Sequence, residues 1–196
     1  MRLPPLASLL DTPISAAVPG PEHSVFQNVE PPPRRISPGS MLALAGFLGL
    51  CLLVGLSDSA ITQTSVHGWF LALRHPAGTP PNWVFPVAWS ASYTLMAVAA
   101  WLVWRRAGIA RRRHYQALRL WGWQLLANAL WTPAFFGLHR PGLALAVILA
   151  MDALVAATLL AFRKVDRVAA GLMAPYLAWG AYAAWLNAGL WWLNRA

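Results

Sequence analysis

The sequence predicts an all-α, polytopic membrane protein: a bundle of five transmembrane helices with a lid loop between the first and the second. Of its 196 residues, 58% are hydrophobic and only 11% are charged, whereas about a quarter of the residues of a soluble domain are charged. The sequence contains several apolar runs whose lengths are close to the roughly 20 residues that a helix needs to cross a bilayer. The charged residues gather between these runs. We therefore expect one transmembrane domain over residues 41–196, preceded by an extension over residues 1–40.

The N-terminal extension is rich in proline and includes the consecutive residues Pro31, Pro32 and Pro33. A segment of this composition buries too little apolar surface to offset the entropy lost on ordering. We expect residues 1–40 to be disordered.

The first expected span covers residues 41–61 and contains Asp58 near its end. A charge in that position more often reaches the membrane interface than takes part in chemistry. The span also carries Gly49 and Gly55, and small residues of this kind let helices approach closely in lipid.

Residues 62–82 form the longest connection between spans. Trp69 and Phe70 belong to a short stretch that can lie at the interface as an amphipathic helix. Pro80 and Pro81 stiffen the remainder because proline restricts its own backbone and that of the preceding residue. A stiff apolar loop at the membrane face fits either a lid or an interfacial anchor, and both readings stay open on these residues.

The second expected span, residues 83–104, carries Trp89 and Tyr93 four positions apart. At 3.6 residues per turn these two side chains share one face of a helix. The span therefore presents an aromatic face to one side of the bundle.

The third expected span, residues 121–137, combines enough apolar residues to cross a bilayer with two amides in its middle. Gln124, Asn128 and Trp131 lie on one face by the same spacing. An unpaired amide in hydrocarbon is costly, so this face should look inward, toward other helices or a cavity. Pro133 should interrupt the helical hydrogen bonds near the end of the span.

The fourth expected span, residues 142–162, follows after the tight turn of residues 138–141, so it should run antiparallel to the third. Asp152 lies in its middle and should face a partner or water, or be protonated. The fifth expected span covers residues 168–193.

The fifth span places Tyr176, Trp179 and Asn187 on one face. If the faces of the second, third and fifth spans converge, they enclose an apolar pocket with a few fixed polar groups, as binding sites for flat amphipathic molecules do. The alternative is that the amides bond neighbouring helices and the aromatic rings only pack. The sequence contains no GxSxG, P-loop or HExxH motif and no carboxylate pair on one helical face.

The formal net charge of +9 fits membrane orientation better than nucleic-acid binding, because the basic residues lie in short segments between apolar runs. With five spans, the N-terminus and the segments after the second and fourth spans share one side, which should be cytoplasmic or, in an organelle, matrix. The basic residues expected on that side are Arg34, Arg35, Arg105, Arg106, Arg111, Arg112, Arg113, Arg119, Arg163, Lys164 and Arg167.

Three segments, in order, resemble the TspO/MBR family of translocator and tryptophan-rich sensory proteins. They are WFLALRHPAGTPPNWVFPVAWSASYTLM from Trp69, QLLANALWTPAFFG from Gln124, and PYLAW from Pro175 with the following Leu186-Asn187. The resemblance covers roughly residues 41–194. It departs from the family pattern at His75, where the family has lysine, at Gly78, where an aromatic is usual, and at Pro86, where glycine is usual.

This resemblance implies a homodimeric five-helix bundle, in the bacterial cell envelope or a mitochondrial-type membrane, that requires no cofactor and binds porphyrins or haem precursors. Benzodiazepine-type drugs and sterols are further ligands of the family. Porphyrin degradation that depends on light or oxygen, and transport of the ligand across the membrane, are the alternatives to a receptor or sensor. The ligand-binding residues carried over are Trp89, Tyr93, Gln124, Asn128, Trp131, Tyr176, Trp179 and Asn187, beneath a lid that contains Trp69, Pro80 and Pro81.

Overall fold

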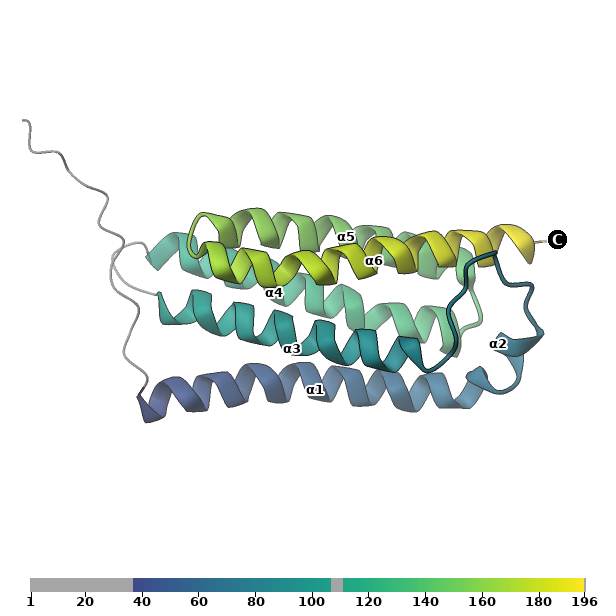
Figure 1. Cartoon of the computed structure of the whole chain (residues 1–196), viewed down its shortest axis with the longest axis horizontal. Coiled ribbons are helices and arrows are strands. Elements are labelled where there is room, and N and C mark those ends of the chain that lie inside the picture. The colour runs from purple at the N-terminus through teal and green to yellow at the C-terminus, as the bar shows by residue number, and fades with distance from the viewer. Residues whose placement is uncertain (1–36, 107–110, 196) are drawn as a thin grey trace, which may run out of the picture. The chain divides into compact units, whose positions relative to one another are not determined.

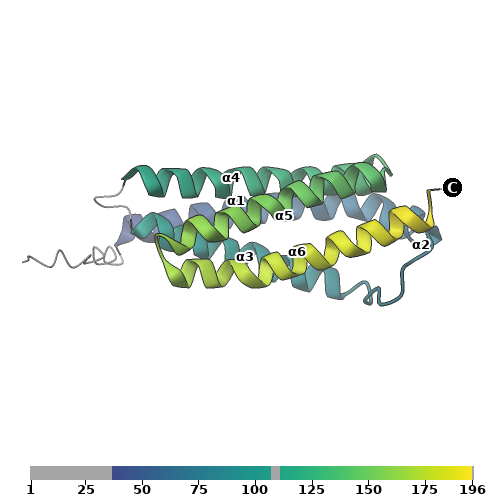
Figure 2. The same cartoon turned by 90° about the horizontal axis from the view of Figure 1, so that it is seen from above.

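The computed structural model describes residues 37–106 and 111–195, and all regular secondary structure within these ranges is helical. Five helices of 22 residues or more lie lengthwise beside one another (Figures 1 and 2). They are α1 (Pro38–Val66), α3 (Val84–Arg105), α4 (Arg111–Thr132), α5 (Pro141–Arg163) and α6 (Arg167–Leu193). A short helix α2 (Trp69–Ala72) follows α1, and a π-helix η2 (Pro133–Gly137) continues α4.

Helices α1, α3 and α5 are long and apolar enough to cross a membrane. Helix α4 begins with three arginines and carries two amides, and α6 is rich in tryptophan and tyrosine, so their mean hydropathy is lower. The described part of the chain therefore has the character of a membrane protein, with three clearly apolar spans.

The first helix starts earlier than the sequence pattern predicts. Helix α1 begins at Pro38 instead of residue 41, because the side chain of Ser37 accepts a hydrogen bond from the Ser40 amide, 3.2 Å away. Serine is a good N-cap, and proline is tolerated in the first turn, where its missing N–H has no helical partner. Of the extension that we predicted to be disordered, residues 1–36 lie outside the described residues, and residues 38–40 belong to α1.

The proline near the end of the third predicted span changes the helix type. From Pro133 the backbone continues as η2, and the amide of Leu138 donates to the carbonyl of Pro133 at 2.8 Å. A proline removes one helical donor, and a π-helical turn is a local departure from the regular α-helix. The chain then reverses within residues 138–140, with His139 at φ 54°, so α4 and α5 are antiparallel neighbours as predicted.

Helix α5 lies between α4 and α6, and α3 packs against α6 and α1. The inward face of α5 is fully buried and repeats every three or four residues. It consists of Ala144, Ile148, Met151, Val155, Thr158 and Phe162. Helix α1 is different, because only Ser40, Cys51 and Ser65 of its 29 residues are buried.

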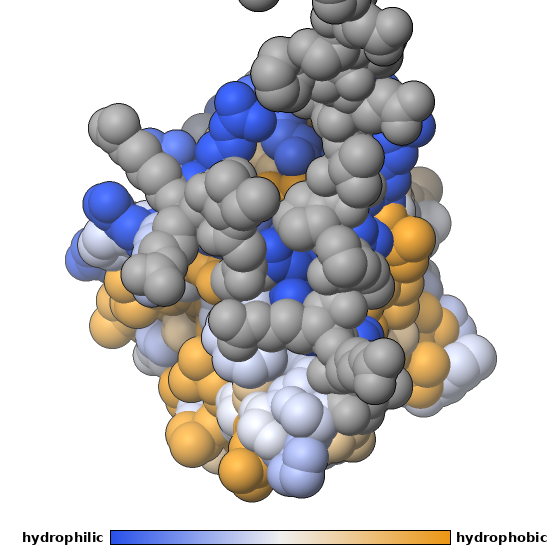
Figure 3. Space-filling view, turned by 90° about the vertical axis from the view of Figure 1, so that its left-hand side faces the viewer, coloured by the Kyte–Doolittle hydropathy of each residue, from blue (hydrophilic) through white to orange (hydrophobic). Residues whose placement is uncertain are grey.

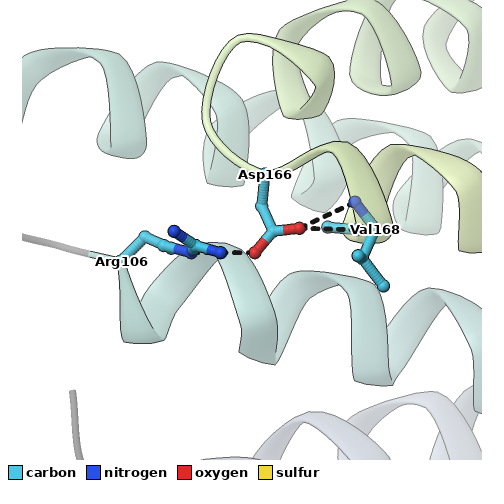
Figure 4. Close-up of polar contacts among 4 residues, drawn as sticks. Arg106, Asp166 and Val168 are labelled. Atoms are coloured by element: carbon cyan, nitrogen blue, oxygen red, sulfur yellow. Dashed lines mark hydrogen bonds and ion pairs between the residues drawn. The ribbon is translucent and has the colours of Figure 1, made fainter. Parts of the chain in front are cut away.

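A carboxylate fastens one end of the bundle. Asp166 precedes α6, and its Oδ1 accepts from the amides of Val168 and Ala169 at 2.8 and 3.0 Å. Its Oδ2 pairs with Nε of Arg106, at the end of α3, at 2.9 Å (Figure 4). The cap stabilises the first turn of α6, and the ion pair links that turn to α3.

The end of the bundle that carries this ion pair is hydrophilic. Figure 3 views the molecule from this end, where hydrophilic residues gather and hydrophobic residues flank them. Its exposed cations include Arg113, Arg163, Lys164 and Arg167. The opposite end carries α2 and the C-terminus (Figure 1).

Candidate functional site

A cavity of about 750 Å³ lies between α1, α3, α4, η2 and α6. Side chains of α1 between Leu48 and Val66 form one wall of the cavity. Phe70 of α2 and residues Thr79 and Asn82 of the connecting loop also line it. The cavity therefore extends to the end of the bundle where α2 lies.

The aromatic wall combines residues from α3, α4 and η2. The rings of Trp89 and Trp131 lie 6.0 Å apart at 32°, and Trp131 stacks on Phe135 at 5.3 Å and 23°. All three side chains line the cavity, and so does Phe136. Offset aromatic surfaces of this kind favour contact with a flat conjugated ligand.

A chain of hydrogen bonds lies beside these rings. The Tyr93 hydroxyl lies 2.7 Å from Oδ2 of Asp58 and 2.7 Å from Oδ1 of Asn128. The Asn128 amide Nδ2 lies 2.8 Å from the hydroxyl of Tyr176. Asp58, Tyr93 and Asn128 line the cavity, whereas Tyr176 is fully buried behind them.

The amide of Asn187 fixes the orientation of Trp131. Its Oδ1 accepts from the Trp131 indole N–H at 3.0 Å, and its Nδ2 donates to the carbonyl of Pro141 at 2.8 Å. Both bonds restrain the amide, since donor and acceptor are each satisfied. Asn187 itself lines the cavity, so α6 supports the aromatic wall and contributes a polar group to the site.

Five of the eight residues predicted to bind a ligand line this cavity: Trp89, Tyr93, Asn128, Trp131 and Asn187. Gln124 does not line it, because it is fully buried one turn before Asn128 with its Nε2 3.5 Å from the Met96 sulfur. Trp179 lies outside the lining too and packs edge-on against Trp89, with ring centroids 6.2 Å apart.

The residues predicted to form a lid lie around the end of the cavity. Trp69 stacks on His139 at 4.3 Å and contacts Phe135 at 5.5 Å, so it lies behind a lining residue. Pro80 and Pro81 do not line the cavity, although their neighbours Thr79 and Asn82 do.

Helix α6 holds the connecting loop in place. The side-chain amide of Asn194 pairs with the backbone of Arg74, accepting from its N–H at 2.9 Å and donating to its carbonyl at 3.0 Å. The hydroxyl of Tyr182 donates to the carbonyl of Gly78 at 2.7 Å. Gly78 has φ 86°, a left-handed conformation that glycine adopts without strain.

The sequence reasoning missed the contribution of α1. The lining residues of this helix fall mostly in adjacent pairs that recur every three or four positions, and several are small or polar within an otherwise apolar span. That periodicity was a usable signal. They include Gly49, Leu52, Gly55, Leu56, Asp58, Ser59, Thr62 and Gln63.

Comparison with known proteins agrees with this architecture. The profile of the TspO/MBR family matches residues 47–193. The chain belongs to the TspO/MBR family. It is 36% identical over 157 residues to protein CrtK of Rhodobacter capsulatus, an alignment that covers 79% of this chain and 94% of the relative.

Two further relatives of this TspO/MBR protein come from a bacterium and a mammal. The tryptophan-rich sensory protein of Cereibacter sphaeroides is 44% identical over 119 residues, covering 61% of this chain and 72% of the relative. The translocator protein of Bos taurus is 33% identical over 150 residues, covering 76% and 89%. Family membership and the apolar helices together establish that the protein is a membrane protein.

Proposed function

We propose that this TspO/MBR protein is a multi-pass membrane receptor or sensor that binds a porphyrin in the cavity between α1 and the other helices. The observation that carries the proposal is the pair of indole rings, Trp89 and Trp131, that faces one cavity of about 750 Å³. Small-molecule sites have volumes of roughly 300–1,000 Å³ and combine apolar walls with a few polar groups.

All five long helices are proposed to cross the membrane. Helices α4 and α6, with 22 and 27 residues, are about 33 and 40 Å long at 1.5 Å per residue, and a hydrocarbon core is about 30 Å thick. They lie alongside the three clearly apolar helices (Figure 1). The basic end then faces the cytoplasm or the matrix, in a bacterial envelope or a mitochondrial-type membrane.

The binding mode follows from the distribution of polar groups in the cavity. The conjugated ring would lie against Trp89 and Trp131. The carboxylates of a porphyrin would lie toward α2, where the side-chain amides of Gln63 and Asn82 offer hydrogen-bond donors. The loop tied to Asn194 would act as the lid, and its ordering on binding would be the signal.

The decisive experiment is a protoporphyrin titration of the purified protein in detergent, followed by the porphyrin absorption band. Absorption is preferable to tryptophan emission because the variants themselves remove a fluorophore. Trp131→Phe alters the aromatic wall, and Asn128→Ala breaks the polar chain beside it. Trp123→Phe is the matched control, since Trp123 lies on the same helix but is exposed on the outer surface.

We expect saturable binding in the micromolar range or tighter, weakened by Trp131→Phe and by Asn128→Ala and unchanged by Trp123→Phe. Loss of one aromatic stacking contact corresponds to about 0.5–1.5 kcal/mol. Absence of saturable binding to the wild-type protein would refute the proposal, and equal weakening by all three changes would place the ligand outside this cavity.

The same indole pair favours a second candidate, oxidative breakdown of the bound porphyrin, because tryptophans in contact with a photoexcited ring can act as electron donors. Illumination in air should then bleach porphyrin faster with wild-type protein than with Trp131→Phe at equal occupancy. Equal bleaching rates would remove this candidate and leave the binding function intact.

A further inference from the structure

Asp58 is the only aspartate, glutamate, lysine or arginine among the described residues that line the cavity. It lies on α1, the helix that packs along α3 (Figure 1), and Tyr93 of α3 is its hydrogen-bond partner. The described lining of the cavity therefore contains a carboxyl group but no lysine or arginine that could neutralise it.

The other titratable groups at the cavity do not supply a counter-charge. His67 follows Asp58 by nine residues, which corresponds to about 13 Å along a helix. Cys51 and Tyr93 also line the cavity, and Tyr176 lies behind Asn128, but none of these three becomes cationic. An ionised Asp58 would thus lack an ion-pair partner in a largely apolar space, which is unfavourable.

The hydrogen bonds allow Asp58 to be neutral or ionised. The Tyr93 hydroxyl has one proton but lies 2.7 Å from two acceptor oxygens, on Asp58 and on Asn128. With Asn128 oriented as described, Tyr93 donates to Asn128, and the proton of its other contact must come from a neutral Asp58 carboxyl.

Rotation of the Asn128 amide by half a turn gives the second arrangement. Its Nδ2 then donates to Tyr93, Tyr93 donates to an ionised Asp58, and the hydroxyl of Tyr176 donates to Asn128 Oδ1. Each contact has one donor and one acceptor in both arrangements. With Asp58 ionised, every hydrogen bond of this chain is therefore still made, and the carboxylate lacks only an opposite charge in the cavity.

We infer that Asp58 recognises a cationic group, so that the cavity prefers flat aromatic ligands carrying an ammonium group over neutral ligands of the same shape. The inference rests on the proposed function, because it assigns a charge preference to the same cavity. The ammonium group would lie at Asp58, and the faces of Trp89 and Trp131 would hold the aromatic part. Cations are also attracted to indole faces, so both features favour the same ligand class.

The test compares two probes that differ only in charge: naphthylpropyl-trimethylammonium and its neutral isostere, in which a tert-butyl group replaces the trimethylammonium group. Affinities are measured in detergent and corrected for partition of each probe into protein-free micelles. Asp58→Asn removes the charge and keeps the shape, Asp58→Glu keeps the charge, and Asp152→Asn is the matched control because Asp152 does not line the cavity.

We expect wild type to bind the cationic probe about tenfold tighter than the neutral one. Asp58→Asn should lower this ratio toward one without weakening the neutral probe, although the indole faces can retain a small part of the preference. Asp58→Glu and Asp152→Asn should preserve the wild-type ratio. If the wild-type protein bound the cationic and the neutral probe with equal affinity, that result alone would overturn the inference. An unchanged ratio in Asp58→Asn would overturn it as well.

A parallel protoporphyrin titration separates this inference from the proposed function. Saturable porphyrin binding with a probe ratio near one would refute only the charge preference. A clear preference for the cationic probe without porphyrin binding would support the role of Asp58 and refute the proposed ligand class. Failure of both probes and of protoporphyrin to bind would overturn both.

Discussion

The substitution Gly189→Ala tests whether the connecting loop closes the cavity. A Cβ atom on Gly189 of α6 would lie 2.8 Å from Cβ and 2.9 Å from Cγ of Pro76 in the loop. Carbon atoms in favourable contact lie about 3.5–4.0 Å apart. The loop must therefore move by roughly 0.6–1.2 Å, because the proline ring cannot rotate away from the new methyl group.

The cost of this displacement follows from the contacts that hold the loop. Inserting a methylene-sized group into a packed contact costs about 1–3 kcal/mol. Alanine also favours the helix by about 0.5–1 kcal/mol relative to glycine. Gly171→Ala is the matched control, since it makes the same change in the same helix with no atom within 4 Å of the new Cβ. We expect Gly189→Ala to be less stable than Gly171→Ala by about 1–3 kcal/mol.

Hydrogen–deuterium exchange and thermal unfolding in detergent measure the two consequences. The amides of Arg74 and Thr79, which donate to Asn194 and to the carbonyl of Pro76, should exchange faster in Gly189→Ala and at the wild-type rate in Gly171→Ala. If the loop is a lid, bound porphyrin should also dissociate faster from Gly189→Ala. Equal exchange rates and equal porphyrin dissociation rates in both variants would refute the idea that the loop closes the cavity through this contact.

Three other substitutions test separate parts of the protein. Asp166→Asn keeps an oxygen that can cap α6 but removes the charge paired with Arg106, so the free energy of unfolding should fall by about 1–3 kcal/mol; an unchanged denaturant midpoint would contradict a stabilising ion pair. Gly78→Ala forces a side chain into the left-handed region at φ 86°, which should cost about 1–2 kcal/mol and increase exchange in the loop; wild-type protection there would count against this conformation. Asn187→Ala removes the hydrogen bond that orients Trp131, so porphyrin affinity should fall about tenfold, which corresponds to 1.4 kcal/mol; undiminished affinity would show that the indole keeps its orientation without this amide.

The positions and faces of the helices could be predicted from the sequence. The apolar runs located the five long helices within a few residues, apart from α4, which begins ten residues before the predicted span at Arg111. Helical periodicity correctly placed Tyr93, Asn128 and Asn187 on inward faces, because an unpaired polar group in hydrocarbon is costly whatever the details of packing.

Only the tertiary structure decided which part of each inward face lines the cavity. Gln124 and Asn128 share a face, yet one is enclosed by packing and the other lines the site. Periodicity fixes the direction of a side chain around the helix axis. It does not fix how closely the neighbouring helices approach at that depth.

The sequence by itself determined that this chain forms apolar helices with aromatic and amide faces, since composition and spacing are local properties. The tertiary structure decided the partners of those faces, such as Tyr93 with Asp58, 35 residues away, and Arg74 with Asn194, 120 residues away. Such pairs depend on the lateral order and axial register of the helices, which arise from packing along their whole length. For this reason Asp58, which the sequence pattern placed near the membrane interface, lines the cavity in the structure.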